Sequence, residues 1–153
     1  TYTMTLDSAM YQLQPDTFVV DSLVRPPSLS DNQISLTDQG IDDVRKAAKE
    51  HLTWCLANKE TIKPECGLNY TGTFDDQKLV TDSLECKVSS GGGAIDRAEI
   101  VVNSNDVAQM AAELDMKWNC VMKAENGKLY QGTHSVPGYN AEVTSEGVKV
   151  TFR

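Results

Sequence analysis

The sequence predicts an α+β fold in which one main amphipathic helix packs on a mostly antiparallel sheet of hairpins. Three observations support this fold class. Apolar residues recur at helical spacing through residues 41–55, apolar and polar residues alternate through residues 113–122, and turn signals such as Asn126-Gly127 separate the later segments. A helix that precedes consecutive hairpins typically covers one face of the sheet they form.

The first part of the chain has the patterns of β-structure. Residues 1–6 alternate in polarity, with Tyr2 on the apolar side, and residues 16–24 are rich in β-branched side chains. Pro26-Pro27 ends the second segment, because proline cannot donate to a strand ladder. We therefore expect a loop over residues 25–35.

The helix has a clear beginning and a clear end. Thr37 is suited to be the N-cap, and Leu36 and Ile41 then occupy the two positions of a hydrophobic staple. Pro64 forbids continuation, so the helix should end near Asn58. Spacings of three and four place one set of apolar residues on a single face: Ile41, Val44, Ala48, Leu52 and Cys55.

Two strands are expected between the helix and the alternating segment. They cover residues 78–88 and 98–104. The Ser-Ser-Gly-Gly-Gly stretch at 89–93 is interpreted as a flexible connection. A phosphate-binding loop would need a following helix and a Lys-Ser/Thr pair, and the sequence after residue 93 suggests neither.

The C-terminal third predicts two hairpins. Asn126-Gly127 predicts a type I′ turn from a strand over residues 111–123 into residues 128–132. A last hairpin should join residues 140–144 to residues 148–152. One face of the first of these strands carries the side chains expected in the core: Leu114, Met116, Trp118, Cys120 and Met122.

Length and charge limit the class of protein. We expect residues 1–153 to form one domain, because no linker divides the chain. The net charge is −8 without any Lys/Arg block, which argues against a nucleic-acid partner. No apolar run approaches the length of about 20 residues that spans a bilayer. The start at Thr1 suggests a mature or excised chain, with any membrane attachment made through a removed N-terminal anchor.

Four cysteines, at positions 55, 66, 86 and 120, allow three disulfide connectivities. Geometry favours Cys55–Cys66, because the chain can fold back after the helix, and Cys86–Cys120, because both residues lie on inward faces of strands. Two disulfides imply an oxidising compartment. Reduced, buried thiols are the alternative.

No residues group into a catalytic or metal-binding pattern. The spacing of the cysteines and of His51 and His134 does not match known zinc sites, so we expect no metal and no cofactor. His134 has Thr133 and Ser135 beside it, but triad partners normally come from distant segments. We therefore interpret His134 as a solvated loop residue, His51 as a partly buried packing residue, and assign no catalytic residue.

Trp54 is the candidate partner-binding residue. Helical geometry places it roughly 120° from the centre of the apolar stripe. It should point away from the core, beside the loop between Cys55 and Cys66. Either residues 59–68 or the N-terminal segment cover it, or it anchors a partner, as tryptophans often do in interfaces.

The segment "LTWCLANKETIKPECGLNY" resembles exported domains of actinobacterial membrane-anchored proteins and lipoproteins. Leu52, Cys55, Pro64 and Cys66 carry the likeness, and Gly67 departs from it, because proline is expected there. The resemblance implies an exported domain of uncharacterised function behind an N-terminal anchor. It implies no catalytic residue.

These features predict a non-enzymatic, extracytoplasmic domain of a membrane-anchored cell-envelope protein that binds a protein or cell-wall partner. Two alternatives stay open: a sensor domain that holds a small apolar ligand in the concavity of the sheet, and a small hydrolase with His134 as base. A pocket where His134 meets a carboxylate would favour the hydrolase. A filled core with an exposed apolar surface would favour the binding domain.

Overall fold

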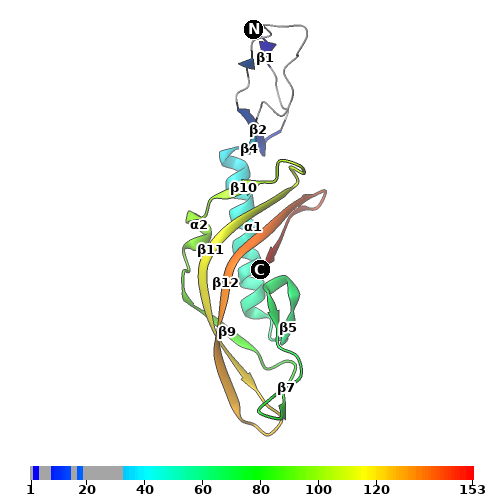
Figure 1. The fold of residues 1–153 in the computed structure, drawn as a ribbon, viewed down its shortest axis with the longest axis vertical. Coiled ribbons are helices and arrows are strands. Elements are labelled where there is room, and N and C mark those ends of the chain that lie inside the picture. Colours follow the sequence, from blue (N-terminus) through cyan, green and yellow to red (C-terminus); the bar gives the residue numbers. More distant parts are fainter. Residues whose placement is uncertain (1, 4–7, 15–16, 19–32) are drawn as a thin grey trace.

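The computed structural model describes residues 2–3, 8–14, 17–18 and 33–153 (Figure 1). Predictions for the remaining residues, such as most of the strand over 16–24 and the break at Pro26-Pro27, lie outside the described residues. The fold is mixed α+β and mostly sheet, as predicted. In chain order the elements are β1 (Tyr2–Thr3), β2 (Tyr11–Gln14), β3 (Thr17–Phe18), β4 (Gln33–Leu36), α1 (Asp38–Ala57), β5 (Ile62–Lys63), the 3₁₀ helix η2 (Pro64–Cys66), β6 (Leu68–Asn69), β7 (Thr73–Phe74), β8 (Gln77–Lys78), β9 (Glu85–Ser90), α2 (Ala94–Arg97), β10 (Ile100–Val102), β11 (Gln109–Lys123), β12 (Leu129–Thr144) and β13 (Gly147–Phe152).

The main sheet has five antiparallel strands arranged around β11. On one side, β11 pairs with β12, and β12 pairs with the outer strand β13. On the other side, β10 pairs with residues 110–112 of β11 and β9 pairs with residues 117–121. In Figure 1 the long β11 and β12 run side by side along most of the molecule, with α1 alongside them. Smaller two-stranded pairs complete the fold: β1–β3, β2–β4, β5–β6 and β7–β8.

β12 is one unbroken strand, so the prediction of two separate segments at 128–132 and 140–144 was wrong. The register between β11 and β12 shifts by one residue between the pairs Glu113–Gly138 and Met116–Val136. Pro137 lies within this shift. Proline has no N–H to donate, and the ladder is already irregular at this position, so the strand can contain it. The sequence signal of a turn at this proline therefore marks an irregularity inside a strand.

The turn between β11 and β12 also differs from the prediction. A type I′ turn requires positive φ at both central residues, but Asn126 does not have it. The N–H of Gly127 donates to the Ala124 carbonyl, and Gly127 alone takes a left-handed φ of 86°. This is the pattern of a type I turn followed by a glycine bulge.

The helix α1 follows its sequence signals closely. The Thr37 side chain accepts a hydrogen bond from the Gly40 N–H, and Asn58 is the C-cap. One face is buried against the sheet, and it carries Val44, Ala48 and Cys55. Within the described residues, no helix combines the length and apolar character that a membrane crossing requires.

The prediction of a loop up to residue 35 was wrong, and so was the expectation that no helix follows the glycines at 91–93. Residues 33–36 form β4, which pairs with β2, because their alternating side chains find a partner strand in the N-terminal segment. Residues 94–97 form the short helix α2 directly after the glycines, with Ile95 buried in the core. A single turn of four residues places Ile95 inward although it is too short to show periodicity in the sequence.

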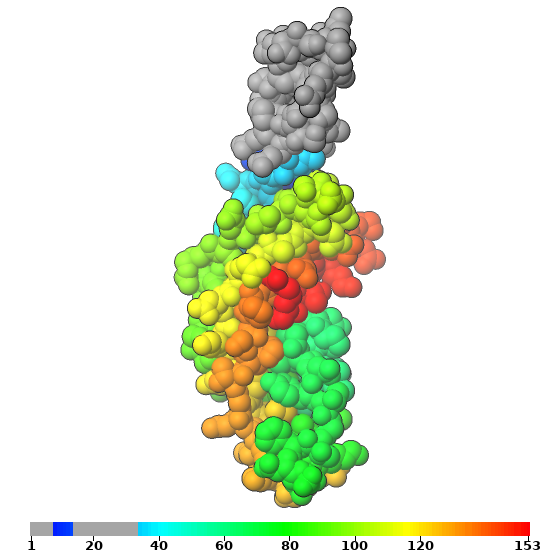
Figure 2. Space-filling model, in the orientation of Figure 1, coloured from blue at the N-terminus to red at the C-terminus, as the bar shows by residue number. Residues whose placement is uncertain are grey.

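The core lies between α1 and the inward face of the sheet, as the alternation predicted. Its largest side chains, Trp118, Tyr139 and Phe152, are at most 2% exposed, and Phe152 meets both of the other rings edge-on. The residues between β5 and β8 continue the molecule at one end, beside the tip of the β11–β12 hairpin (Figure 2). An isolated bridge between Leu79 and Ala124 fixes this contact.

Candidate functional site

A groove opens between α1 and the outer strand β13, with a volume of about 450 Å³. Helix α1 contributes one wall, β13 the other, and η2 closes one side. Apolar surface predominates over polar surface in the lining. The lining residues are Ala47, Glu50, His51, Trp54, Glu65, Val148, Lys149 and Val150.

Trp54 is the principal aromatic residue of this groove. It lies off the buried face of α1, as its helical position predicted, and its side chain is 45% exposed. The expectation that residues 59–68 cover the ring holds only in part, because Glu65 reaches the groove but nearly half of the tryptophan surface stays open. Exposed large aromatic side chains in a concave surface are typical of binding sites.

His51 packs directly against the ring of Trp54. The two rings are stacked, with centroids 5.6 Å apart and planes inclined by 15°. The imidazole also contacts Phe152 at 5.2 Å between centroids, and its Nε2 atom lies 2.8 Å from the Glu65 carbonyl oxygen. His51 therefore links α1, η2 and β13, and the prediction of a packing role agrees with these contacts.

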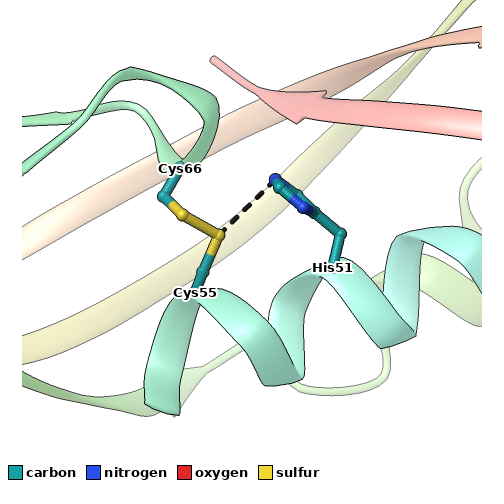
Figure 3. A group of neighbouring side chains, drawn as sticks. All are labelled: His51, Cys55 and Cys66. Atoms are coloured by element: carbon teal, nitrogen blue, oxygen red, sulfur yellow. Dashed lines mark hydrogen bonds between the residues drawn. A yellow bond between two sulfur atoms is a disulfide. The ribbon is translucent and has the colours of Figure 1, made fainter. Parts of the chain in front are cut away.

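The Cys55–Cys66 disulfide fixes η2 against the end of α1 (Figure 3). Both cysteines are fully buried, and their Cα atoms are 5.8 Å apart. The second disulfide, Cys86–Cys120, joins residues that face each other directly in the β9–β11 ladder. These are the two pairings that geometry favoured from the sequence, and no cysteine is left free.

His51, Cys55 and Cys66 bring three potential metal-ligand atoms within 4.8 Å of one another. The His51 Nε2 atom lies 3.5 Å from the Cys55 sulfur (Figure 3). However, zinc binds cysteine as the thiolate, and here the two sulfurs are bonded to each other. The oxidised cluster therefore serves as a covalent connection beneath the groove and offers no thiolate to a metal.

Lys63 supports the same region and was not singled out by the sequence. Its side chain is almost completely buried, and its Nζ atom donates to the carbonyl oxygens of Cys55, at 2.8 Å, and Asn58. A cation at this position satisfies carbonyls that lack partners at the helix C-terminus and complements the helix dipole. Burial lowers the pKa of Lys63, and the nearby Glu60 carboxylate partly opposes that shift.

His134 is not the solvated loop residue that the sequence suggested. It lies in β12, opposite Trp118, with the two ring centroids 5.4 Å apart. Its Nε2 atom is buried without a well-formed hydrogen bond. Burial lowers its pKa, while the adjacent Cys66 backbone partly opposes the shift. Within the described residues no hydrogen bond joins His134 to a carboxylate, so the geometry expected for a catalytic base is not formed there.

The charged side chains at the groove are unevenly distributed. Glu50 on α1, Glu65 on η2 and Lys149 on β13 all line the groove. The alternation of β13 turns the Lys149 side chain to the face of the sheet opposite to that of Val148 and Val150. Within the residues that the structure describes, none of the three takes part in an ion pair. The groove therefore offers an aromatic surface with one glutamate on α1 and another on η2.

Trp54 was identified from the sequence, but the groove around it was not. Glu50 and His51 precede Trp54 by four and three residues on α1, so their proximity to Trp54 could be found from helical spacing. Glu65 lies in η2, and helical spacing does not place it beside Trp54. Nothing local links them to Val148 and Val150, which come from a strand about a hundred residues later.

Comparison of the chain with protein-family models, with curated proteins and with solved structures found no match.

Proposed function

We propose that this chain is a non-enzymatic, extracytoplasmic domain of a membrane-anchored cell-envelope protein, and that a protein or cell-wall partner docks in the groove between α1 and β13. The observation that carries the proposal is Trp54, which is 45% exposed in a groove and stacks on His51. His51 in turn contacts the Cys55 sulfur of the Cys55–Cys66 disulfide. A rigid aromatic platform binds with little loss of conformational freedom.

The size of the open tryptophan surface is sufficient for an anchor. If a tryptophan side chain offers about 250 Å², the exposed part amounts to roughly 110 Å². At about 25 cal/mol per Å², its complete burial would contribute about 2–3 kcal/mol to binding. That contribution is in the range of interface residues whose truncation is readily measured.

The covalent structure supports the proposed compartment. Two disulfides are compatible with an oxidising, extracytoplasmic environment and are uncommon in reducing compartments. The membrane anchor and the cell-envelope setting rest on the resemblance carried by Leu52, Cys55, Pro64 and Cys66.

The two alternatives have less support. The concavity of the sheet, where either alternative would place its ligand or its catalytic centre, is filled by Trp118, Tyr139 and Phe152. His134 packs into this aromatic cluster beside Trp118. A filled core with an open apolar groove outside it favours the binding domain.

The proposal is tested by Trp54→Ala. We expect the variant to lose at most about 1 kcal/mol of folding stability, as exposed substitutions do, but to retain a partner from envelope extract or from purified cell wall at least about 30-fold more weakly, which corresponds to the 2 kcal/mol above.

Phe74→Ala is the matched control, because Phe74 is an equally exposed aromatic residue on β7, remote from the groove. Unchanged retention by Trp54→Ala, or an equal loss in Phe74→Ala, would contradict the proposal.

A further inference from the structure

We infer that the groove receives an extended peptide segment of a partner protein, which adds to the free edge of β13 as a further strand and places basic side chains near Glu50 and Glu65. The inference rests on the proposed function and specifies how the partner is recognised. Extended peptides commonly bind in this way to sheet edges, through main-chain hydrogen bonds and alternate side-chain pockets.

The backbone of β13 offers free hydrogen-bonding groups to the groove. The Arg153 N–H donates to the Gly138 carbonyl, so the backbone of Arg153 points toward β12. The backbone groups of successive strand residues point to opposite sides of the strand. The N–H and C=O groups of Lys149 therefore also point toward β12, whereas those of Val148 and Val150 point outward. No hydrogen bond between the described elements uses these outward groups.

The edge is open only where the groove is. Farther along β13, η2 packs against the strand, and Gly67 lies close to the Arg153 backbone. Val148 and Val150 instead line the groove opposite α1. The available stretch therefore matches a short extended segment that occupies the groove lengthwise.

The side chains around this edge suit an alternating sequence. Val148 and Val150 turn their side chains toward the core side of the sheet, where Val150 is buried. Successive side chains of an added strand point to opposite faces. Every second residue of the peptide would therefore face α1 and meet the apolar surface of Ala47 and Trp54.

The charged residues at the groove indicate which kind of peptide binds there. Glu50 and Glu65 line the groove, whereas the Lys149 side chain points to the opposite face of the sheet from Val148 and Val150, and the chain as a whole carries a net charge of −8. Such a surface attracts basic partners and repels acidic ones. The occupant is therefore an extended segment that combines apolar residues with Lys or Arg.

A phage-displayed library of random dodecapeptides, selected on the folded domain, tests this inference. Enriched peptides should carry apolar residues at alternate positions and should also contain Lys or Arg. Amide hydrogen exchange followed by NMR should then show fast exchange at Val148 and Val150 in the free domain, and at least tenfold slower exchange when an enriched synthetic peptide is bound. Lys149, already bonded to β12, should change less.

Val150→Pro removes one outward N–H without breaking the ladder to β12, and it should weaken peptide binding at least tenfold. Val102→Pro in β10, on the opposite side of the sheet, is the matched control and should bind normally.

Enrichment of acidic peptides, no enrichment at all, or unchanged exchange at Val148 and Val150 in the bound state would overturn strand addition. Any of these results combined with Trp54-dependent capture of an envelope partner would leave the proposed function standing. A dimer in sedimentation that Val150→Pro dissociates would assign the edge to a second copy of the chain and would also overturn the inference.

Discussion

His134 and Trp118 face each other across β11 and β12, with 5.4 Å between their ring centroids. In the sequence, His134 lies among Thr, Ser, Pro and Gly, which favoured a solvated loop. Its burial could not be predicted, because it depends on a long β12 that carries it beneath η2. The burial of Trp118 could be predicted, because the alternation of β11 is uninterrupted around it.

The stability of the domain should decrease as the pH falls below 6.5, the ordinary pKa of histidine. Burial lowers the pKa of His134 in the folded chain. Below this pH, His134 therefore binds a proton more readily in the unfolded chain than in the folded chain, and this favours unfolding. Urea unfolding at pH 7 and pH 5 should show a smaller free energy of unfolding at pH 5.

His134→Phe keeps an aromatic ring against Trp118 but cannot titrate, so its stability should change less between the two pH values. A wild type and variant with the same pH dependence would show that His134 is not responsible.

At the scale of elements, periodic segments were predictable and irregular ones were not. The stripe and caps of α1 and the alternation of β11 are local patterns, and both elements form as expected. β12 was divided in the prediction because Pro137-Gly138 has the composition of a turn. The groove could not be predicted at all, since α1 and β13 are joined only by the packing of the folded chain.

The two disulfides stabilise these elements to different degrees. They close loops with sequence separations of 11 and 34 residues. In the chain-entropy model this corresponds to about 3 kcal/mol for Cys55–Cys66 and about 4 kcal/mol for Cys86–Cys120.

The double variants Cys55→Ala/Cys66→Ala and Cys86→Ala/Cys120→Ala should therefore both unfold at lower denaturant concentration, with the larger effect for the second pair. Partner retention should nevertheless suffer more from loss of Cys55–Cys66, because that bond holds η2 beneath the groove. The opposite order in retention would show that the disulfide does not shape the binding surface.

At the scale of the whole molecule, the net charge and the two disulfides both bear on the proposed function. Two disulfides cross-link a domain with a filled aromatic core, and the net charge of −8 is one reason for proposing a basic partner. The groove is a small part of the surface, yet it combines an exposed tryptophan, an open strand edge and charges without ion-pair partners among the described residues. Its position outside the core lets a partner bind without disturbing the fold.

Site-specific photo-crosslinking in intact cells tests whether a partner occupies the groove between α1 and β13. A benzoylphenylalanine replaces Trp54 in one variant and Phe74 in another, both within the full-length protein. The account predicts a discrete crosslinked species from position 54 and none from position 74, because only the groove between α1 and β13 holds the partner. A discrete species from position 74 alone, or none from position 54, would contradict it.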